Sequence, residues 1–235
     1  MTSDLSFRGG ATSATLTVRP SARARVMRLR VDPRTGAVVL TLPRRMSKRR
    51  ALEWASEQRA WVEAALAAIE PPEAVLPGAE VPLHALPHPI DWSPGRPRTP
   101  RVEGGRILVG GPIETLQPRI LRWLKREALT RLSEETAHYA AKAGVAVDRV
   151  GVGDPVSRWG SCSSSGTIRY SWRLILAPEF VRRATVAHEV AHRVHMNHGP
   201  AFHALVERLF DADPKPARLW LRREGARLHR FGRTL

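Results

Sequence analysis

Two histidines four positions apart constrain this chain more than any other feature. His188 and His192 enclose Glu189 in the pattern His-Glu-x-x-His, within a stretch over 185–195 that can be helical. On a helix, residues four apart lie on one face, so the two imidazoles can bind one metal ion. Glu189 can then reach a water on the metal without binding the metal, and zinc makes such a water acidic enough for a carboxylate to accept its proton. The pattern predicts a helix that carries a catalytic zinc ion.

A third histidine follows six residues after the second. Catalytic zinc characteristically has three protein ligands and a water, and His198 fills the third place. Asn197 is a suitable residue for a left-handed helix end, Gly199 permits a tight turn, and Pro200 suits the first position of a new helix over 200–210. We therefore expect His198 in a short elbow that bends back toward the metal.

Other residues near this segment leave alternatives open. Glu207, one turn beyond His203, is a fallback third ligand. For His195 and His203 a surface position is the favoured interpretation, because isolated histidines are usually structural. The clustering of histidines between positions 188 and 203 could also be accidental.

A polar turn and an alternating segment precede the site. The turn occupies 157–166, and the alternation that follows puts one set of residues on one side of a strand and a second set on the other. The first set is Ile168, Tyr170, Trp172, Leu174 and Leu176, and the second is Arg169, Ser171 and Arg173. This strand could be a sheet edge that pairs with an extended peptide substrate, or equally an ordinary interior strand.

The chain has one cysteine, Cys162, in this polar turn. A thiol nucleophile paired with a nearby histidine is one interpretation, but that mechanism does not require three clustered histidines and Glu189. We favour a small buried or turn residue. One cysteine excludes an internal disulfide and a cysteine-rich zinc site, and it fits a reducing cytoplasm.

The first third of the chain predicts a β-rich part with a helix. Residues 26–31 and 38–42 alternate as the strands of a hairpin around a turn at 32–36. Ser47 is a plausible N-cap for one helix that continues to about Ile69, and we assign its tryptophans to the core. Residues 71–118 are rich in Pro and Gly, which predicts turns and short strands such as 107–109.

The remaining segments predict a catalytic half. A long helix should begin near Pro118 and end at Gly144, with a strand over 145–152. The segment 214–235 carries seven basic residues and one acid, and a short helix within it could dock through Leu219, Trp220, Leu221 and Leu228. We place a soft boundary near Pro112, between an accessory region over 1–112 and a catalytic domain over 113–235 with a basic C-terminal tail.

The net charge of +16 raises the possibility of a polyanionic partner such as nucleic acid. Only four of the 38 basic residues are Lys, however, and such a preference for Arg can equally reflect genome composition. No run of about 18 apolar residues and no secretory signal pattern is present, so we expect a cytoplasmic protein without a membrane span.

These motifs resemble the YgjP-like metal-dependent hydrolases, relatives of the SprT and WLM zincin proteases. The resemblance covers roughly 145–210 and is carried by Arg158-Trp159-Gly160-Ser161-Cys162, Trp172-Arg173-Leu174, His188-Glu189-x-x-His192, Asn197-His198 and Phe202. It implies a zincin-like α+β domain with an active-site helix on a small mixed or antiparallel sheet, and a smaller β-rich part before it. The resemblance also implies zinc ligands at His188, His192 and His198, with Glu189 as the base.

Two departures qualify the resemblance. His203 stands where the family pattern leads us to expect Trp after Phe202, and His195 stands where the similarly spaced metzincins have Gly. Relatives of the SprT type act on proteins associated with DNA, which by analogy offers a purpose for the basic charge.

Two functions of different classes follow from the sequence. The first is a peptidase with one zinc per chain, a protein or peptide substrate, and oxyanion or substrate contacts from Arg158, Tyr170 or His195. The second is a non-catalytic, metal-stabilised module whose basic surface binds nucleic acid. Glu189 discriminates between them, because a purely structural site does not need a carboxylate next to its ligand.

Overall fold

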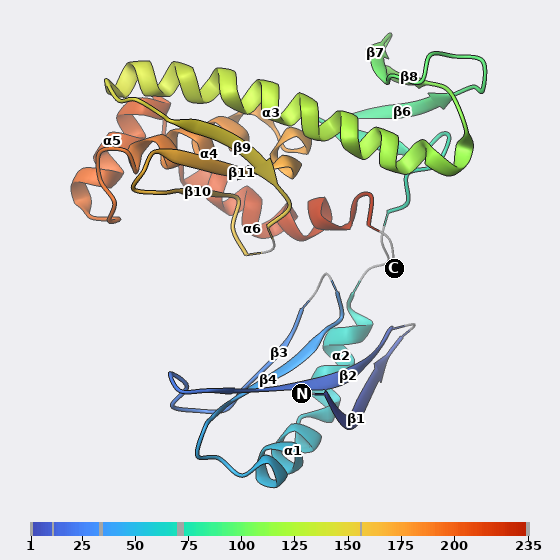
Figure 1. Ribbon diagram of the computed structural model, residues 1–235, viewed down its shortest axis with the longest axis vertical. Coiled ribbons are helices and arrows are strands. Elements are labelled where there is room, and N and C mark those ends of the chain that lie inside the picture. Colours follow the sequence, from blue (N-terminus) through green and yellow to red (C-terminus); the bar gives the residue numbers. More distant parts are fainter. Residues whose placement is uncertain (1, 11, 33–34, 70–72, 156, 234–235) are drawn as a thin grey trace. The chain divides into compact units, whose positions relative to one another are not determined.

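The computed structural model describes residues 2–10, 12–32, 35–69, 73–155 and 157–233 (Figure 1). The chain forms two compact units, Met1–Pro72 and Glu73–Leu235. The composition had predicted a boundary near Pro112 instead. The physical reason for the difference is that Val81, Ile90 and Ile107 are buried in the same hydrophobic core as the helices that follow them, so 73–112 packs with the second unit.

The first unit is built on a four-stranded sheet in the order β1-β2-β4-β3. Its strands are β1 (Thr2–Gly9), β2 (Thr12–Ser21), β3 (Arg28–Val31) and β4 (Val38–Pro43). The antiparallel pair of β3 and β4 is the predicted hairpin, with Val31 opposite Val38, while Pro33 and Arg34 of the predicted turn lie outside the described residues. We did not predict β1 and β2.

Two helices, rather than the single one predicted, follow this sheet. The helix α1 (Lys48–Glu57) and the helix α2 (Arg59–Ala67) are separated at Gln58, whose ψ of 8° is not helical. Val62 and Leu66 are fully buried in the core of this unit. The neighbouring Trp61 is 51% exposed, so its assignment to the core was wrong. The reason is that α2 packs on the sheet through the face that carries Val62 and Leu66, and Trp61 lies off that face.

The second unit begins with the short strands expected from its Pro and Gly content. They are β5 (Glu80–Leu83), β6 (Leu86–Trp92), β7 (Arg101–Glu103) and β8 (Arg106–Val109), in the order β5-β6-β8-β7. A 3-10 turn η1 (Ile113–Thr115) leads into the long helix α3 (Leu116–Ala143). This helix has Pro118 in its first turn and ends at Gly144 with a φ of 67°, as the sequence predicted.

A three-stranded mixed sheet follows α3 in the order β10-β11-β9. Its strands are β9 (Arg149–Gly153), β10 (Gly160–Cys162) and β11 (Thr167–Ser171), with β11 parallel to β9 and antiparallel to β10. The strand proposed as a substrate-binding edge is therefore interior, and among the described strands β10 forms the edge.

The alternating segment is also shorter as a strand than predicted. The chain leaves the sheet after Ser171, whose side chain accepts a hydrogen bond from the Arg173 N–H and starts the 3-10 helix η2 (Trp172–Leu176). Arg173, expected on the polar side, is buried: it pairs with Asp154 at 2.7 Å and donates to the Leu228 and Phe231 carbonyls. This buried guanidinium network holds the turn inward.

Three helices complete the unit: α4 (Glu179–Ala191), α5 (Pro200–Phe210) and α6 (Lys215–Arg230). The helix α4 contacts β10, α3, α5 and α6 (Figure 1). This confirms the predicted α+β class, in which the helix that carries the site packs on a small mixed sheet. The basic C-terminal segment is thus an integral helix. It docks through Ala217, Gly225 and Leu228, whereas Leu219, expected to dock, is 57% exposed.

The end of α4 also differs from the prediction. The helix stops at Ala191 with His192 as its C-cap, and Asn197 has no left-handed backbone. A left-handed backbone is found instead at Asp211, which ends α5. None of the described helices is long and apolar enough to cross a bilayer.

Candidate metal centre

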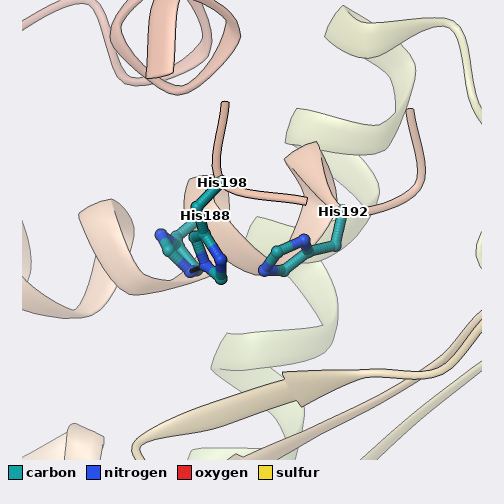
Figure 2. Close-up of side chains that lie close together, drawn as sticks. All are labelled: His188, His192 and His198. Atoms are coloured by element: carbon teal, nitrogen blue, oxygen red, sulfur yellow. Dashed lines mark hydrogen bonds between the residues drawn. The ribbon is translucent and has the colours of Figure 1, made fainter. Parts of the chain in front are cut away.

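The last turn of α4 and the elbow after it bring three imidazoles together. His188 and His192 come from α4 and its C-cap, and His198 comes from the segment before α5. One ring nitrogen from each lies within 4.8 Å of the others, and the rings of the three side chains converge (Figure 2). The Nε2 atoms of His188 and His198 are 3.3 Å apart. Two nitrogens bound tetrahedrally at 2.0–2.1 Å from one zinc ion lie about 3.4 Å apart, so this spacing fits a shared ion.

A backbone contact orients the second imidazole. His192 is only 9% exposed, and its Nδ1 lies 3.0 Å from the carbonyl oxygen of His195. If Nδ1 carries the proton and donates to this carbonyl, Nε2 keeps its lone pair free for a metal. His195 therefore contributes its main chain to the site, and its side chain is not part of the three-histidine group.

Phe202 packs against all three imidazole rings. Its buried ring lies with its centroid 4.9 Å from His188, 4.6 Å from His192 and 4.8 Å from His198. Packing against one rigid aromatic ring limits the rotamers that the imidazoles can adopt. The group is therefore held in place by apolar packing from α5 as well as by α4.

The surroundings of His188 and His192 favour the neutral form of these two imidazoles. Burial, followed by the neighbouring His192 and His198, lowers the pKa of His188 to about 4. Burial also lowers the pKa of His192. A metal ligand must be the neutral imidazole, so the site is arranged in the protonation state that a cation requires.

Glu189 lies beside this group but is not one of its members. It is 6% exposed, and burial raises the pKa of its carboxyl to about 7, while the positive charge of Arg158 acts in the opposite direction. Gly160 on β10 makes room for it, since a Cβ at position 160 would lie 2.4 Å from Glu189 Oε1. The carboxylate thus lies between the helix and the sheet edge.

A cavity of about 270 Å³ opens at His188 and Glu189. Its walls come from β10, α4, α5 and α6, and they include Arg158, His203 and Arg218. Sequence reasoning identified Arg158 and expected a C-terminal helix to dock through Leu221, but it placed neither Arg218 nor that helix at the cavity. The usable signal was Ala217 and Leu221, which lie four apart on one face of α6 and both line the cavity.

Three residues considered from the sequence lie elsewhere. Tyr170 is fully buried and its hydroxyl is 3.0 Å from Thr136 Oγ1, so its side chain does not reach the cavity as a substrate contact. Glu207 is exposed and outside the histidine group, so the fallback ligand is not needed. Cys162 does not line the cavity, and burial raises the pKa of its thiol, which is the opposite of activation for nucleophilic attack.

Comparison with known proteins gives a family match over most of the chain. The family model of the YgjP-like metallopeptidase domain matches residues 25–224. The crystal structure of the metallopeptidase zymogen of Pyrococcus abyssi abylysin matches 39% of this chain and 93% of that chain at 19% identity, with a TM-score of 0.35. A structural similarity this low says nothing further about the fold. No curated protein matches the chain.

Proposed function

This chain belongs to the YgjP-like metallopeptidase family, and from that membership we propose that it is a zinc-dependent peptidase with Glu189 as its general base. The metal ligands we propose are His188, His192 and His198. The second unit has a zincin-like α+β fold and contains every residue of the site. We therefore propose that Glu73–Leu235 is the catalytic unit and that Met1–Pro72 has an accessory role. The observation that carries the proposal is the convergence of three imidazole nitrogens beside a buried carboxylate.

The donor set fits zinc. Three neutral imidazole nitrogens suit a borderline divalent cation, and the spacing of 3.3 Å between His188 and His198 suits tetrahedral coordination with one position left open. A zinc ion held there would polarise a peptide carbonyl and lower the pKa of a water molecule.

The residues around the ion would carry the proton and the developing charge. Glu189 follows the first histidine on α4, where its carboxylate can accept a proton from water and then donate it to the leaving nitrogen. Arg158 lines the same cavity with a guanidinium that can stabilise negative charge on the carbonyl oxygen. Tyr170 is not a candidate for that role, because its hydroxyl pairs with Thr136 inside the core.

The free edge of β10 offers a place for the substrate main chain. One side of Gly160–Cys162 pairs with β11, and among the described strands none pairs with the other side. We propose that an extended peptide adds to this edge by backbone hydrogen bonds, which places a peptide bond close to Glu189. Such binding accepts unfolded segments and depends little on their sequence.

The rival function, a non-catalytic metal-stabilised module, is less well supported. Structural zinc sites usually have four protein ligands and are closed to solvent. Only three candidate ligands gather in the part of the chain that the structure describes, and they adjoin an open cavity. Glu189, which a structural site does not need, lines that cavity.

The deciding experiment is the change Glu189→Gln. Gln keeps the size of the side chain but cannot accept a proton from water, so the variant should retain its zinc and lose hydrolysis by about 10²–10⁴-fold. The measurement compares zinc content and cleavage of an unfolded protein by wild type and variant. Equal cleavage rates with equal zinc would exclude Glu189 as the base.

A further inference from the structure

Four arginines line a second cavity, which shares no residue with the catalytic one. Arg98, Arg119, Arg122 and Arg126 surround about 380 Å³, together with the hydroxyls of Thr99 and Thr115. Its lining residues come from the loop before β7, from η1 and from the first turns of α3. No acidic side chain is among its lining residues. A cavity with this lining is chemically suited to an anion with several oxygens.

Arg119 is fixed in place without losing its charge. Its guanidinium donates to the carbonyls of Gly110 and Pro112 and to the Thr115 hydroxyl. All three acceptors are neutral, so the positive charge has no carboxylate partner in these contacts. The side chain is therefore positioned in advance, as a binding group should be.

Gly111 allows the arginines to converge. It has a φ of 85°, and a Cβ at this position would lie 2.9 Å from Arg98 Cγ and 3.1 Å from Arg119 Nη2. Any side chain here would be strained and would push the two arginines away. The absence of a side chain thus helps to shape the cavity.

Arg122 and Arg126 extend the positive charge along α3. They lie three and seven residues after Arg119, on the same helix face, and both are exposed. Like charges at this spacing repel each other. Some exposed helical arginines of the described chain have acidic partners four residues away, as in Arg49–Glu53 and Arg59–Glu63, but no ion pair is found for Arg122 or Arg126 among the described residues. A bound polyanion would relieve this repulsion.

An apolar surface adjoins the charged cavity. A neighbouring cavity shares Arg98 and is lined also by Trp92, Ile113 and Glu114, among others. The indole N–H of Trp92 donates to the Gly111 carbonyl at 3.0 Å, which fixes the ring, and Ile113 is 41% exposed. Charged groups beside a fixed aromatic ring are typical of proteins that bind single-stranded nucleic acid, in which phosphates and bases alternate.

We propose that this arginine cavity binds a backbone phosphate of single-stranded nucleic acid, with an adjacent base against the apolar surface at Trp92. The site is separate from the histidine group, so binding should not require the metal. The net charge of +16 does not say where a nucleic acid would bind, whereas the arginine cavity is a defined location.

The test measures the affinity of the full chain for a fluorescent 12-residue oligothymidylate at several salt concentrations. The site variant is Arg122→Gln with Arg126→Gln. The control is Arg208→Gln with Arg222→Gln, which removes the same charge from exposed helix positions that line no described cavity. Thermal unfolding of both variants checks their folding, and Arg98→Gln, in a loop, is a second site variant that leaves α3 unchanged.

We expect the wild type to bind in the presence and absence of a chelator. The site variant should lose about tenfold or more in affinity at low salt, and its slope of log affinity against log salt should fall by about 1.4 in magnitude, or about 0.7 for each phosphate that is no longer neutralised. The control should change by less than about threefold, and an abasic oligomer of equal length should bind more weakly than oligothymidylate.

Three results would overturn the proposal. The first is no binding at low salt, and the second is an equal loss in the site and control variants, which would mean diffuse attraction. In the third, poly-glutamate or inorganic phosphate competes as well as the oligonucleotide, which would assign the cavity to an acidic polypeptide or to a free anion. None of these results bears on peptide hydrolysis, which is assayed separately.

Discussion

Gly160 lies so close to Glu189 that a Cβ at position 160 would approach the carboxylate oxygen Oε1 to 2.4 Å and its Cγ to 2.5 Å. The edge strand β10 and the helix α4 therefore meet at a residue without a side chain. The close approach keeps Glu189 buried and directed into the cavity, where the proposed mechanism requires it.

The first prediction concerns Gly160→Ala. The added methyl group must displace the Glu189 side chain, so hydrolysis should fall by about tenfold to 10²-fold, since a displacement of about 1 Å can cost 10² in rate. Zinc content should not change, because no metal ligand moves. The control is Gly151→Ala in the same sheet, where a Cβ would meet nothing within 4 Å. Unchanged activity in Gly160→Ala would mean that the position of Glu189 does not limit the rate.

The second prediction concerns the metal. Replacing His188, His192 or His198 with Ala should reduce bound zinc from about one per chain to well below that, because two remaining nitrogens hold the ion poorly. His203→Ala is the matched control, since its ring centroid is 6.5 Å from that of His198 and it lies outside the group. Elemental analysis after dialysis measures the metal, and circular dichroism checks the fold. Full zinc in all three variants would rule out this ligand set.

The third prediction separates Arg158 from Tyr170. Arg158→Gln removes a positive charge from the cavity and should lower kcat by about 10-fold to 10³-fold with a smaller change in KM. Tyr170→Phe removes only a hydroxyl that pairs with Thr136 in the core, so it should cost about 0.5–1.5 kcal/mol of stability and leave kcat unchanged. Steady-state kinetics and denaturant unfolding of both variants provide the data. A loss of kcat in Tyr170→Phe alone would reverse the assignment.

Local sequence patterns were sufficient where a local rule determines the structure. Gly144 ends α3 because glycine accepts a left-handed backbone, and Pro200 begins α5 because it fits the first turn of a helix. The spacing of His188 and His192 likewise led to α4. These features depend on a few neighbouring residues.

Sequence patterns failed where contacts between residues far apart in the chain determine the position of a side chain. The alternation through Leu176 looked like one strand, but Arg173 turns inward because Asp154 and two carbonyls near the C-terminus hold it. Arg218 could not be placed in the cavity without knowing that α6 packs against α4. Tyr170 alternates with the apolar residues of its segment, but only the structure reveals that its hydroxyl pairs with Thr136 in the core rather than reaching the cavity.

The last prediction concerns acid stability and a buried contact outside the metal centre. His84 connects the turn between β5 and β6 to α4, where its Nδ1 lies 2.9 Å from a guanidinium nitrogen of Arg182, which also pairs with Glu135 at 2.8 Å. Since Arg182 can only donate, His84 must accept and must be neutral. Burial, then Arg182, lowers the pKa of His84 to about 4, with further contributions from Arg131, His88 and, in the opposite direction, Glu179.

The sign of the effect follows from proton binding. Below the usual histidine pKa of about 6.5, the unfolded chain binds a proton at His84 that the folded chain does not bind until the pH nears 4, so folding stability falls across this range as pH decreases. Because His84 is half-buried, we expect the free energy of unfolding to fall by about 1–3 kcal/mol rather than by the full value for the shift.

The comparison variant is His84→Asn, which does not titrate and tolerates the φ of 54° at this position. Urea unfolding at pH 7, 6, 5 and 4 should show that the free energy of unfolding falls more steeply with decreasing pH in the wild type than in the variant. This holds whatever the difference in stability between the two proteins at pH 7. If the two curves of unfolding free energy against pH are parallel, His84 titrates alike in the folded and unfolded chain. The contact with Arg182 would then not constrain the protonation of His84.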